Sequence, residues 1–292
     1  MIYDVKHVTT YVYETPVTFA RCTLRLTPPS NAEQSVINAD IDVEPRPATM
    51  AQRRCFFGNV VTTLTIEQPH EEAVFTLRAR VDVHRSPLAT ALPGETLDAV
   101  RAMAANVGGV DASSPANYLF PSDRAPRYAP AVDYARASFP AERAALDGAL
   151  DLMRRIRADF RYDPDSTKVW TPLSQAFEQR SGVCQDFAHI MIAGLRGLGL
   201  PAAYVSGYLR TLPPPGKPRL EGADATHAWV NVWCGPRVGW VGLDPTNAIP
   251  AGDDHIVLAT GRDYADVAPV DGILFGAGAQ KVQVSVDVTE AA

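Results

Sequence analysis

Apolar and polar residues alternate in short segments over the first 85 residues of the chain. Segments of this kind, rich in Val, Thr, Ile and Tyr, are typical of half-buried β-strands. The predicted strands are Tyr3–Tyr13, Cys22–Leu26, Val36–Val43, Val60–Glu67 and Val74–His84. Short strands at this spacing, separated by prolines and a Gly-Asn step, predict a β-sandwich over residues 1–85. No titratable residues cluster there, so we interpret this part as a structural or recognition module.

The pattern changes twice after residue 85. Residues 86–144 are rich in Pro, Ser and Ala, which predicts a connector with one short helix over Thr96–Asn106. Apolar residues then recur every three or four positions from Leu146 to Phe160, as in an amphipathic helix. Further helices are predicted at Leu173–Arg180 and from Cys184 onward, and strands at Ala202–Leu212, Thr226–Cys234, Val238–Asp244 and Lys281–Val288. Helices followed by antiparallel strands predict an α+β domain over residues 145–292, with the C-terminal strand included.

Composition and charge narrow the possible functions only slightly. Of the 292 residues, 46% are apolar and 21% are charged, as in ordinary globular domains. The formal charge is −6 and no Lys/Arg block offsets it, so we do not expect nucleic-acid binding. The start MIYDVKHVTT lacks the basic and apolar regions of a signal peptide, and no run of about 18 apolar residues occurs. We therefore expect a cytoplasmic protein without a membrane segment, whose cysteines at 22, 55, 184 and 234 are reduced thiols.

The segment RSGVCQDFAHIMIAGLRGLGLP predicts a buried helix that begins near Cys184. Its apolar residues form one helical stripe, Ser181-Gly182 precedes it, and Gly199 with Pro201 ends it. A helix N-terminus carries a partial positive charge and free N–H groups, which lower the pKa of a thiol and bind an oxyanion. Cys184 is therefore a candidate nucleophile. The alternative is that it is simply a small residue of the core.

The segment ATHAWVNVWCGPRVGWVGLDPTN predicts a β-hairpin centred on Gly235-Pro236, with a type II′ turn. In that register His227 and Asp244 lie directly opposite each other, with Cβ atoms about 4.5–5.5 Å apart. A carboxylate in this place fixes the tautomer of an imidazole that acts as a base. Trp229 shares the face of His227 and is expected to flank the imidazole at a substrate cleft. The alternatives are a core histidine beside tryptophans and an ordinary Asp-Pro turn.

The spacing of cysteines and histidines does not indicate a metal site. Cys184 and His189 are five residues apart on one predicted helix, about 500° of rotation, and so point away from a common ion. No second Cys or His stands at zinc-site spacing. We expect His189 to make a hydrogen bond within the fold instead.

Taken together, GVCQDFAH, THAWVNVW and GWVGLDPTN resemble the transglutaminase-like superfamily, in particular its bacterial branch of transglutaminase-like proteins and cysteine proteases. These motifs cover about residues 145–250. YDVKHVTTYVY and FFGN resemble the β-rich N-terminal region of that branch, although Cys55 stands where the branch usually has an Asp. HIVLATGRDYADVAPVDG is similar to the stretch that follows the family's catalytic Asp. The resemblance therefore spans most of the chain.

The resemblance implies a papain-like cysteine proteinase fold, in which the helix of the nucleophile packs against a sheet that carries the base. It implies that Cys184 is the nucleophile, that His227 is the general base and acid, and that Asp244 orients His227. Gln185 and Asp186 match the family's CQD motif and are candidates for the oxyanion site or for its support. An acid in the first turn of a helix also explains Asp186 without any catalytic role.

The expected reaction is attack of Cys184 on an amide carbonyl of a peptide or protein, which gives a thioester that water or an amine resolves. Hydrolysis and transfer both stay open, and no cofactor is expected. Trp170 and the loop Thr211–Ala225 are candidate walls of a substrate cleft, but core packing is the simpler explanation for Trp170 and a surface connection explains the loop equally well. Two other functions remain, namely acyl transfer on small molecules and a non-catalytic scaffold or peptide-binding role.

Overall fold

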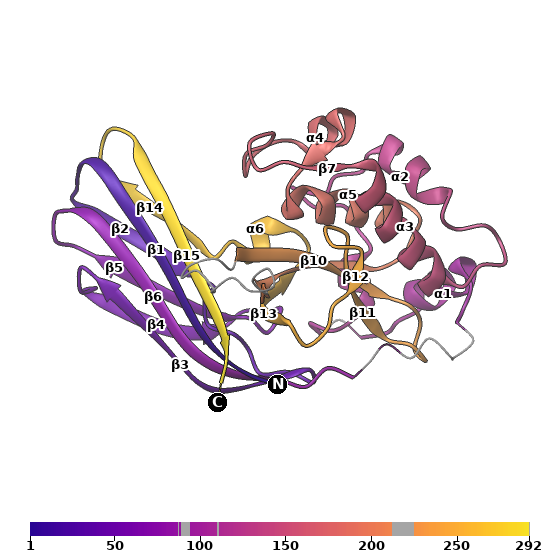
Figure 1. Cartoon of the computed structure of the whole chain (residues 1–292), viewed down its shortest axis with the longest axis horizontal. Helices are drawn as coiled ribbons and strands as arrows, with labels where there is room; N and C mark the ends of the chain where they lie inside the picture. The colour runs from indigo at the N-terminus through magenta and orange to yellow at the C-terminus, as the bar shows by residue number, and fades with distance from the viewer. Residues whose placement is uncertain (87, 89–93, 110, 212–224, 292) are drawn as a thin grey trace, which may run out of the picture.

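A β-sandwich and an α+β part lie side by side in the computed structural model (Figure 1). The structure describes residues 1–86, 88, 94–109, 111–211 and 225–291. The two ends of the chain lie together at one end of the sandwich, where the Ala291 N–H donates to the Ile2 carbonyl at 2.8 Å (Figure 1). Within the described ranges, no helix is both long enough and apolar enough to cross a membrane.

The sandwich contains two four-stranded antiparallel sheets, with strand orders β15-β1-β6-β3 and β14-β2-β5-β4. The strands are β1 (Ile2–Val17), β2 (Phe19–Leu24), β3 (Gln34–Glu44), β4 (Thr49–Arg54), β5 (Val60–Ile66), β6 (His70–Val83), β14 (Val270–Phe275) and β15 (Gln280–Glu290). Alternate residues of β1, such as Tyr3, Val5 and His7, are buried. The alternation in the sequence therefore reflects a strand with one face toward the core and a more exposed opposite face. Strand β4 was not predicted, because all of its residues are exposed and no apolar alternation marks it.

The last two strands belong to the sandwich. Strand β14 pairs with β2, and β15 pairs with β1 from Tyr3↔Glu290 to Tyr13↔Gln280. The prediction that the C-terminal strand belongs with residues 145–292 is therefore wrong. Alternation of side chains predicts that a strand exists, but it carries no information about a partner that is nearly the whole chain away.

The α+β part has a five-stranded antiparallel sheet, in the order β12-β11-β10-β9-β13, with helices on one face (Figure 1). Its strands are β9 (Ala202–Leu209), β10 (Ala225–Trp233), β11 (Trp240–Asp244), β12 (Ile249–Pro250) and β13 (His255–Gly261), beside a short parallel pair of β7 (Arg161–Tyr162) and β8 (Ser181–Gly182). Its helices are α1 (Leu97–Ala105), the 3₁₀ turn η1 (Pro115–Tyr118), α2 (Ala129–Arg136), α3 (Ala145–Asp159), α4 (Leu173–Gln179), α5 (Cys184–Gly197) and α6 (Tyr264–Val267).

Helix α5 is the centre of this part. Every residue from Asp186 to Arg196 is buried, because α2, α3 and α4 pack around the helix while β9 and β10 lie beneath it. Ala228, Val230 and Val232 supply the face of β10 that meets these helices. The predicted helices correspond to α1, α3, α4 and α5, whereas α2 lies in the segment that was interpreted as a connector.

Two side-chain amides of the sandwich pair with the outer edge of β13. Gln34 donates to the Val257 carbonyl at 2.9 Å and accepts from the Val257 N–H at 2.8 Å. Asn59 makes the same pair of hydrogen bonds with Thr260, both at 2.8 Å. An edge strand otherwise leaves its N–H and C=O groups unpaired, so these amides replace a further strand and join the two parts. Asn59 ends the FFGN segment, in which Gly58 turns the chain at φ 81°.

Candidate active site

Cys184 is the first residue of α5, and its side chain is half-buried. Val183 before it is extended, with φ −115°, so the helix starts abruptly at the thiol. The N–H groups of Cys184 and Gln185 have no hydrogen-bond acceptor in the part of the chain that the structure describes. The helix dipole and these free donors therefore favour a thiolate and an oxyanion at the same place.

The two residues after Cys184 hold the preceding loop against α5. Asp186 Oδ2 accepts from the Val183 N–H at 2.9 Å and from the Thr167 hydroxyl at 2.7 Å. Burial raises the pKa of Asp186, and both hydrogen bonds oppose that shift. Gln185 Nε2 donates to the Val169 carbonyl at 3.0 Å. In this structure both side chains thus support the start of α5 and the loop before it.

His227 and Asp244 meet across the hairpin of β10 and β11, with Nε2 and Oδ2 2.8 Å apart. The prediction that they lie directly opposite is wrong, because the observed register is shifted by two residues. The turn is wider than a two-residue loop, and the Gly239 N–H donates to the Gly235 carbonyl at 2.7 Å. A shift of two keeps both side chains on the same face of the sheet. The imidazole and the carboxylate therefore meet diagonally.

Asp244 is fully buried and is surrounded by donors. Its Oδ1 accepts from the backbone N–H groups of Thr246 and Asn247 at 2.9 and 3.2 Å. Its Oδ2 accepts from His227 and, at 2.7 Å, from the side-chain amide of Asn247. Burial by itself raises the pKa of this carboxyl, but the hydrogen bonds from His227, His255 and Asn247 hold it well below its usual range. Asp244 thus initiates the Asp-Pro turn and at the same time pairs with His227.

A second imidazole contacts the same carboxylate. His255 is the first residue of β13 and is buried, with Nε2 3.4 Å from Asp244 Oδ2. Its Nδ1 accepts from the Gly252 N–H at 3.2 Å. Because Nδ1 accepts, Nε2 is the ring nitrogen that donates to Asp244.

Cys184 lies close enough to His227 to raise the pKa of its imidazole. Burial lowers the pKa of His227, but hydrogen bonds with Asp244 and Cys184 outweigh it and raise the pKa to about 10. Nε2 is paired with Asp244, which leaves Nδ1 as the ring nitrogen available to the thiol. A protonated imidazole at this place stabilises negative charge on the sulfur of Cys184.

Trp229 packs behind the imidazole and does not line an open cleft. Its side chain is fully buried, with its ring 6.4 Å from that of His227 and tilted by 30°. It also meets the His255 ring nearly edge-on at 5.2 Å. It lies over Gly207, where a Cβ atom would be 2.5 Å from the indole. The prediction of a cleft wall at Trp229 is therefore wrong, and its indole holds two imidazoles in place by packing.

Trp170 does lie at a cavity. Its side chain is 72% exposed and lines a hollow of about 300 Å³ together with Gln185 and His189. Core packing therefore does not explain this tryptophan. The other predicted wall was the loop Thr211–Ala225, and its residues 212–224 lie outside the described residues.

The structure also brings together three side chains that can ligate metals. The ligand atoms of His227, Asp244 and His255 lie within 4.8 Å of one another, which the sequence spacing did not reveal. Hydrogen bonds already join these atoms, and Asn247 donates to the same carboxylate oxygen. The arrangement therefore has the chemistry of a hydrogen-bonded acid–base group. His189 makes the predicted hydrogen bond within the fold, where Nε2 accepts from the Tyr264 N–H at 3.2 Å.

Sequence reasoning missed four side chains around the triad. Burial raises the pKa of Tyr162 and of Tyr204, and the neighbouring Cys184 adds to both shifts. Nothing in the sequence pattern marks these tyrosines. Asn247 stands three residues after Asp244 in the DPTN segment. The turn expected at Asp-Pro was a signal that could have placed its side chain near Asp244. His255 is eleven residues from Asp244 in the sequence, and only the packing of the sheet shows that the two side chains are in contact.

Two family models match the chain. The model of the bacterial transglutaminase-like N-terminal region matches residues 3–82. The model of the transglutaminase-like superfamily matches residues 133–245, which contain Cys184, His227 and Asp244. The chain belongs to the transglutaminase-like superfamily. This transglutaminase-like protein is 38% identical over 291 residues to an uncharacterized protein of Mycobacterium tuberculosis, a match that covers 98% of this chain and 92% of that protein.

Two further similarities concern a named enzyme and a solved structure. Over 103 residues the chain is 34% identical to a protein-glutamine gamma-glutamyltransferase of Pseudomonas aeruginosa, which covers 32% of this chain and 15% of that protein. A crystal structure from Cytophaga hutchinsonii, named a putative cysteine protease, matches 100% of this chain and 92% of that chain with a TM-score of 0.72 and 22% identity. This likeness confirms the predicted fold class, a β-rich N-terminal region joined to a papain-like core.

Proposed function

We propose that this protein is a thiol-dependent enzyme that acts on amide bonds of peptides or proteins. The observation that carries the proposal is the row of contacts from Cys184 through His227 to Asp244, with the pKa of His227 raised to about 10. Membership of the transglutaminase-like superfamily supports the same type of enzyme. The partial similarity to a protein-glutamine gamma-glutamyltransferase favours a glutamine side-chain amide as one substrate.

In the proposed reaction the Cys184 thiolate attacks the amide carbonyl carbon. The oxygen that becomes negative accepts hydrogen bonds from the free N–H groups at the start of α5. His227 gives its proton to the leaving nitrogen, the C–N bond breaks, and a thioester remains on Cys184. Water or an amine then gives a proton back to His227, attacks the thioester and releases the thiolate. Asp244 keeps the imidazole oriented throughout.

Alkylation of the free enzyme tests the ion pair directly. At pH 6, we expect iodoacetamide to label Cys184 selectively, as detected by mass spectrometry. Burial raises the pKa of Cys22 to about 11 and that of Cys234 to about 12, so these thiols are expected to react slowly. His227→Ala should abolish the selectivity. Equal rates at all four thiols would contradict the proposal.

A turnover assay separates hydrolysis from transfer. Casein and glutamine-containing peptides are incubated with and without a labelled primary amine, and the products are read by mass spectrometry. Cleavage or deamidation indicates hydrolysis, whereas incorporation of the amine indicates transfer, and Cys184→Ala should stop both. Labelling of Cys184 by an acyl-CoA would instead indicate a small-molecule acyltransferase, and full biological effect of Cys184→Ala would indicate a scaffold.

A further inference from the structure

A buried arginine reaches from the end of the β-sandwich to the sheet that carries the triad. Arg85 stands two residues after β6, and only 5% of its side chain is exposed. Its Cζ atom lies 5.9 Å from the centre of the Trp229 ring. Trp229 is the indole that packs against the rings of His227 and His255. Arg85 is therefore separated from both imidazoles by a single side chain, and the proposed reaction does not use it.

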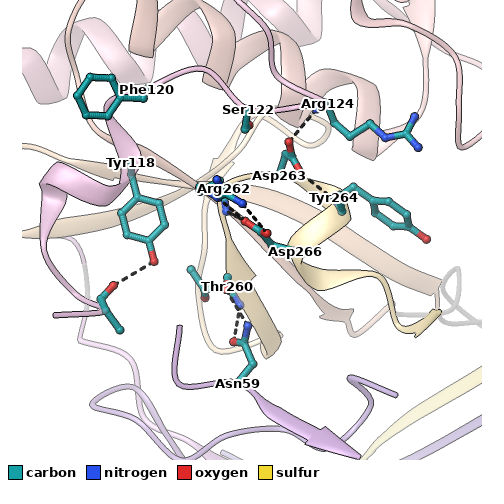
Figure 2. A network of polar contacts seen from close by, with 12 residues as sticks. Asn59, Tyr118, Phe120, Ser122, Arg124, Thr260, Arg262, Asp263, Tyr264 and Asp266 are labelled. Atoms are coloured by element: carbon teal, nitrogen blue, oxygen red, sulfur yellow. Dashed lines mark hydrogen bonds and ion pairs between the residues drawn. The ribbon is translucent and has the colours of Figure 1, made fainter. Parts of the chain in front are cut away.

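Hydrogen bonds do not explain why this guanidinium is buried. In the described part of the chain, Nε and Nη2 of Arg85 make no hydrogen bond, and Nη2 forms an ion pair at 3.3 Å with Glu33, whose side chain is 45% exposed. By contrast, each side-chain nitrogen of the buried Arg196 donates to a backbone carbonyl. The more exposed Arg262 forms two hydrogen bonds with Asp266 (Figure 2). Unpaired nitrogens on a buried cation destabilise the folded protein, so stability alone does not account for Arg85.

A glycine in the hairpin of the triad lies directly beside the guanidinium. Gly242 of β11 pairs with Asn231, which is two residues beyond Trp229 on β10. A Cβ atom on Gly242 would lie 3.5 Å from Nη1 of Arg85. Residues two apart on a strand share one face, so Trp229 lies between the level of Gly242 and that of His227. The guanidinium and the imidazole therefore approach the indole from its two sides along the strand.

The indole of Trp229 is otherwise held by apolar packing. Among the described residues, its Nε1 atom has no hydrogen-bond partner. Val205 and Val257 pack against the ring, and such apolar contacts are not directional. A cation over an aromatic face is attracted by the negative charge of that face. Arg85 thus adds a directional contact to an indole that has no hydrogen bond to orient it.

We propose that Arg85 is a positioning residue of the triad. Its guanidinium holds the indole of Trp229, and the indole keeps the imidazole of His227 in the orientation that serves both Asp244 and Cys184. This inference rests on the proposed function and deepens it. Arg85 lies outside both segments that the family models match, residues 3–82 and 133–245. The end of the sandwich thereby takes part in orienting the base.

The rate at which iodoacetamide labels Cys184 tests this role, and the readout is the ratio of the rate at pH 6 to the rate at pH 9. At pH 6 the reaction needs a well-placed imidazolium to stabilise the thiolate, whereas at pH 9 an ordinary thiol is largely ionised. We expect Arg85→Met to lower this ratio about tenfold, because the imidazole then turns away from the thiol. Loss of charge alone would raise the ratio, since removal of a nearby cation favours the imidazolium. The sign therefore separates positioning from electrostatics.

Three further variants show whether Arg85 acts through the indole. Arg85→Lys keeps the charge without the planar group that stacks on a ring, and it should lower the ratio as well. In a Trp229→Leu background, Arg85→Met should change the ratio less than about twofold, because the contact is already lost. Arg80→Met is the matched control on β6, where the side chain is 45% exposed and pairs with Asp4, and it should keep the wild-type ratio.

Thermal melting checks that each variant is folded, and Arg85→Lys carries the test if Arg85→Met does not fold. A folded Arg85 variant with an unchanged or raised ratio would refute the positioning role. Equal effects of Arg85→Met in the wild-type and Trp229→Leu proteins would refute the path through the indole. Selective labelling of wild-type Cys184 at pH 6 would still support the proposed function in both cases. If iodoacetamide does not select Cys184 in the wild type, the proposed function fails first.

Discussion

The side-chain amide of Gln34 pairs with the backbone of Val257 through two hydrogen bonds of 2.8 and 2.9 Å, as a neighbouring strand would. On its other side Val257 pairs with Gly207, and Gly207 pairs with His227. A continuous ladder therefore runs from the β-sandwich through β13 and β9 to His227. His255, which faces Asp244, starts the same strand β13. The sandwich thus supports the strands that carry the site.

Replacing Gln34 by Leu should destabilise the protein. The N–H and C=O groups of Val257 would lose their partners in a buried place, at a cost of about 1–3 kcal/mol for each group that stays unpaired. Thermal or urea unfolding measures this loss. The matched control is Gln283→Leu on the exposed face of β15, where we expect a change within about 0.5 kcal/mol. Equal stability of the two variants would contradict the role of the Gln34 amide.

His255 should tune the triad through Asp244. His255→Phe removes a hydrogen-bond donor that helps to hold the Asp244 carboxylate in its orientation toward His227, and we expect alkylation of Cys184 at pH 6 to slow by about tenfold, the effect of about 1.4 kcal/mol. His255→Gln can still donate an N–H to Asp244 and should retain most of the rate. A phenylalanine variant that melts normally and reacts as fast as wild type would show that the second imidazole has no such role.

Asp244→Asn should disrupt the thiolate–imidazolium pair while it keeps a side-chain oxygen for the turn. Without the carboxylate, His227 loses the hydrogen bond that contributes most to its raised pKa. We expect turnover to fall by about 10²–10⁴-fold, as when an orienting aspartate is lost from other triads. The rate of alkylation at pH 6 should fall relative to the rate at pH 9, because the imidazolium no longer stabilises the thiolate. An unchanged pH profile would count against the pairing.

The stability of the protein should depend on pH through His227. The folded pKa, raised to about 10, exceeds the ordinary histidine value of about 6.5, so the folded state binds the proton more tightly than the unfolded state does. This stabilisation is fully present below pH 6.5 and is lost as the pH rises toward 10. We therefore expect the difference in unfolding free energy between wild type and His227→Gln to shrink over that range, as urea titrations at pH 6, 8 and 10 would show. A difference that grows with pH would refute the assignment.

The positions of site residues were predictable where their interactions are local in the sequence. The stripe in α5 placed Cys184 at a helix start, because burial follows a period of 3.6 residues. The hairpin placed His227 and Asp244 on one face, and this survived a register error of two residues because side chains alternate with a period of two. The turn itself was misjudged, since the chain around Gly235 and Gly239 forms a wider loop than Gly-Pro suggested.

The sequence by itself determined the types of element, the family resemblance and the three residues of the candidate triad, because periodicity and short motifs record local burial and local chemistry. Only the tertiary structure decided that β15 returns to β1, that Gln34 completes the edge of β13, and that His255 shares the carboxylate of Asp244. Such contacts join segments far apart along the chain. They depend on how whole sheets and helices pack, so no local pattern of side chains encodes them.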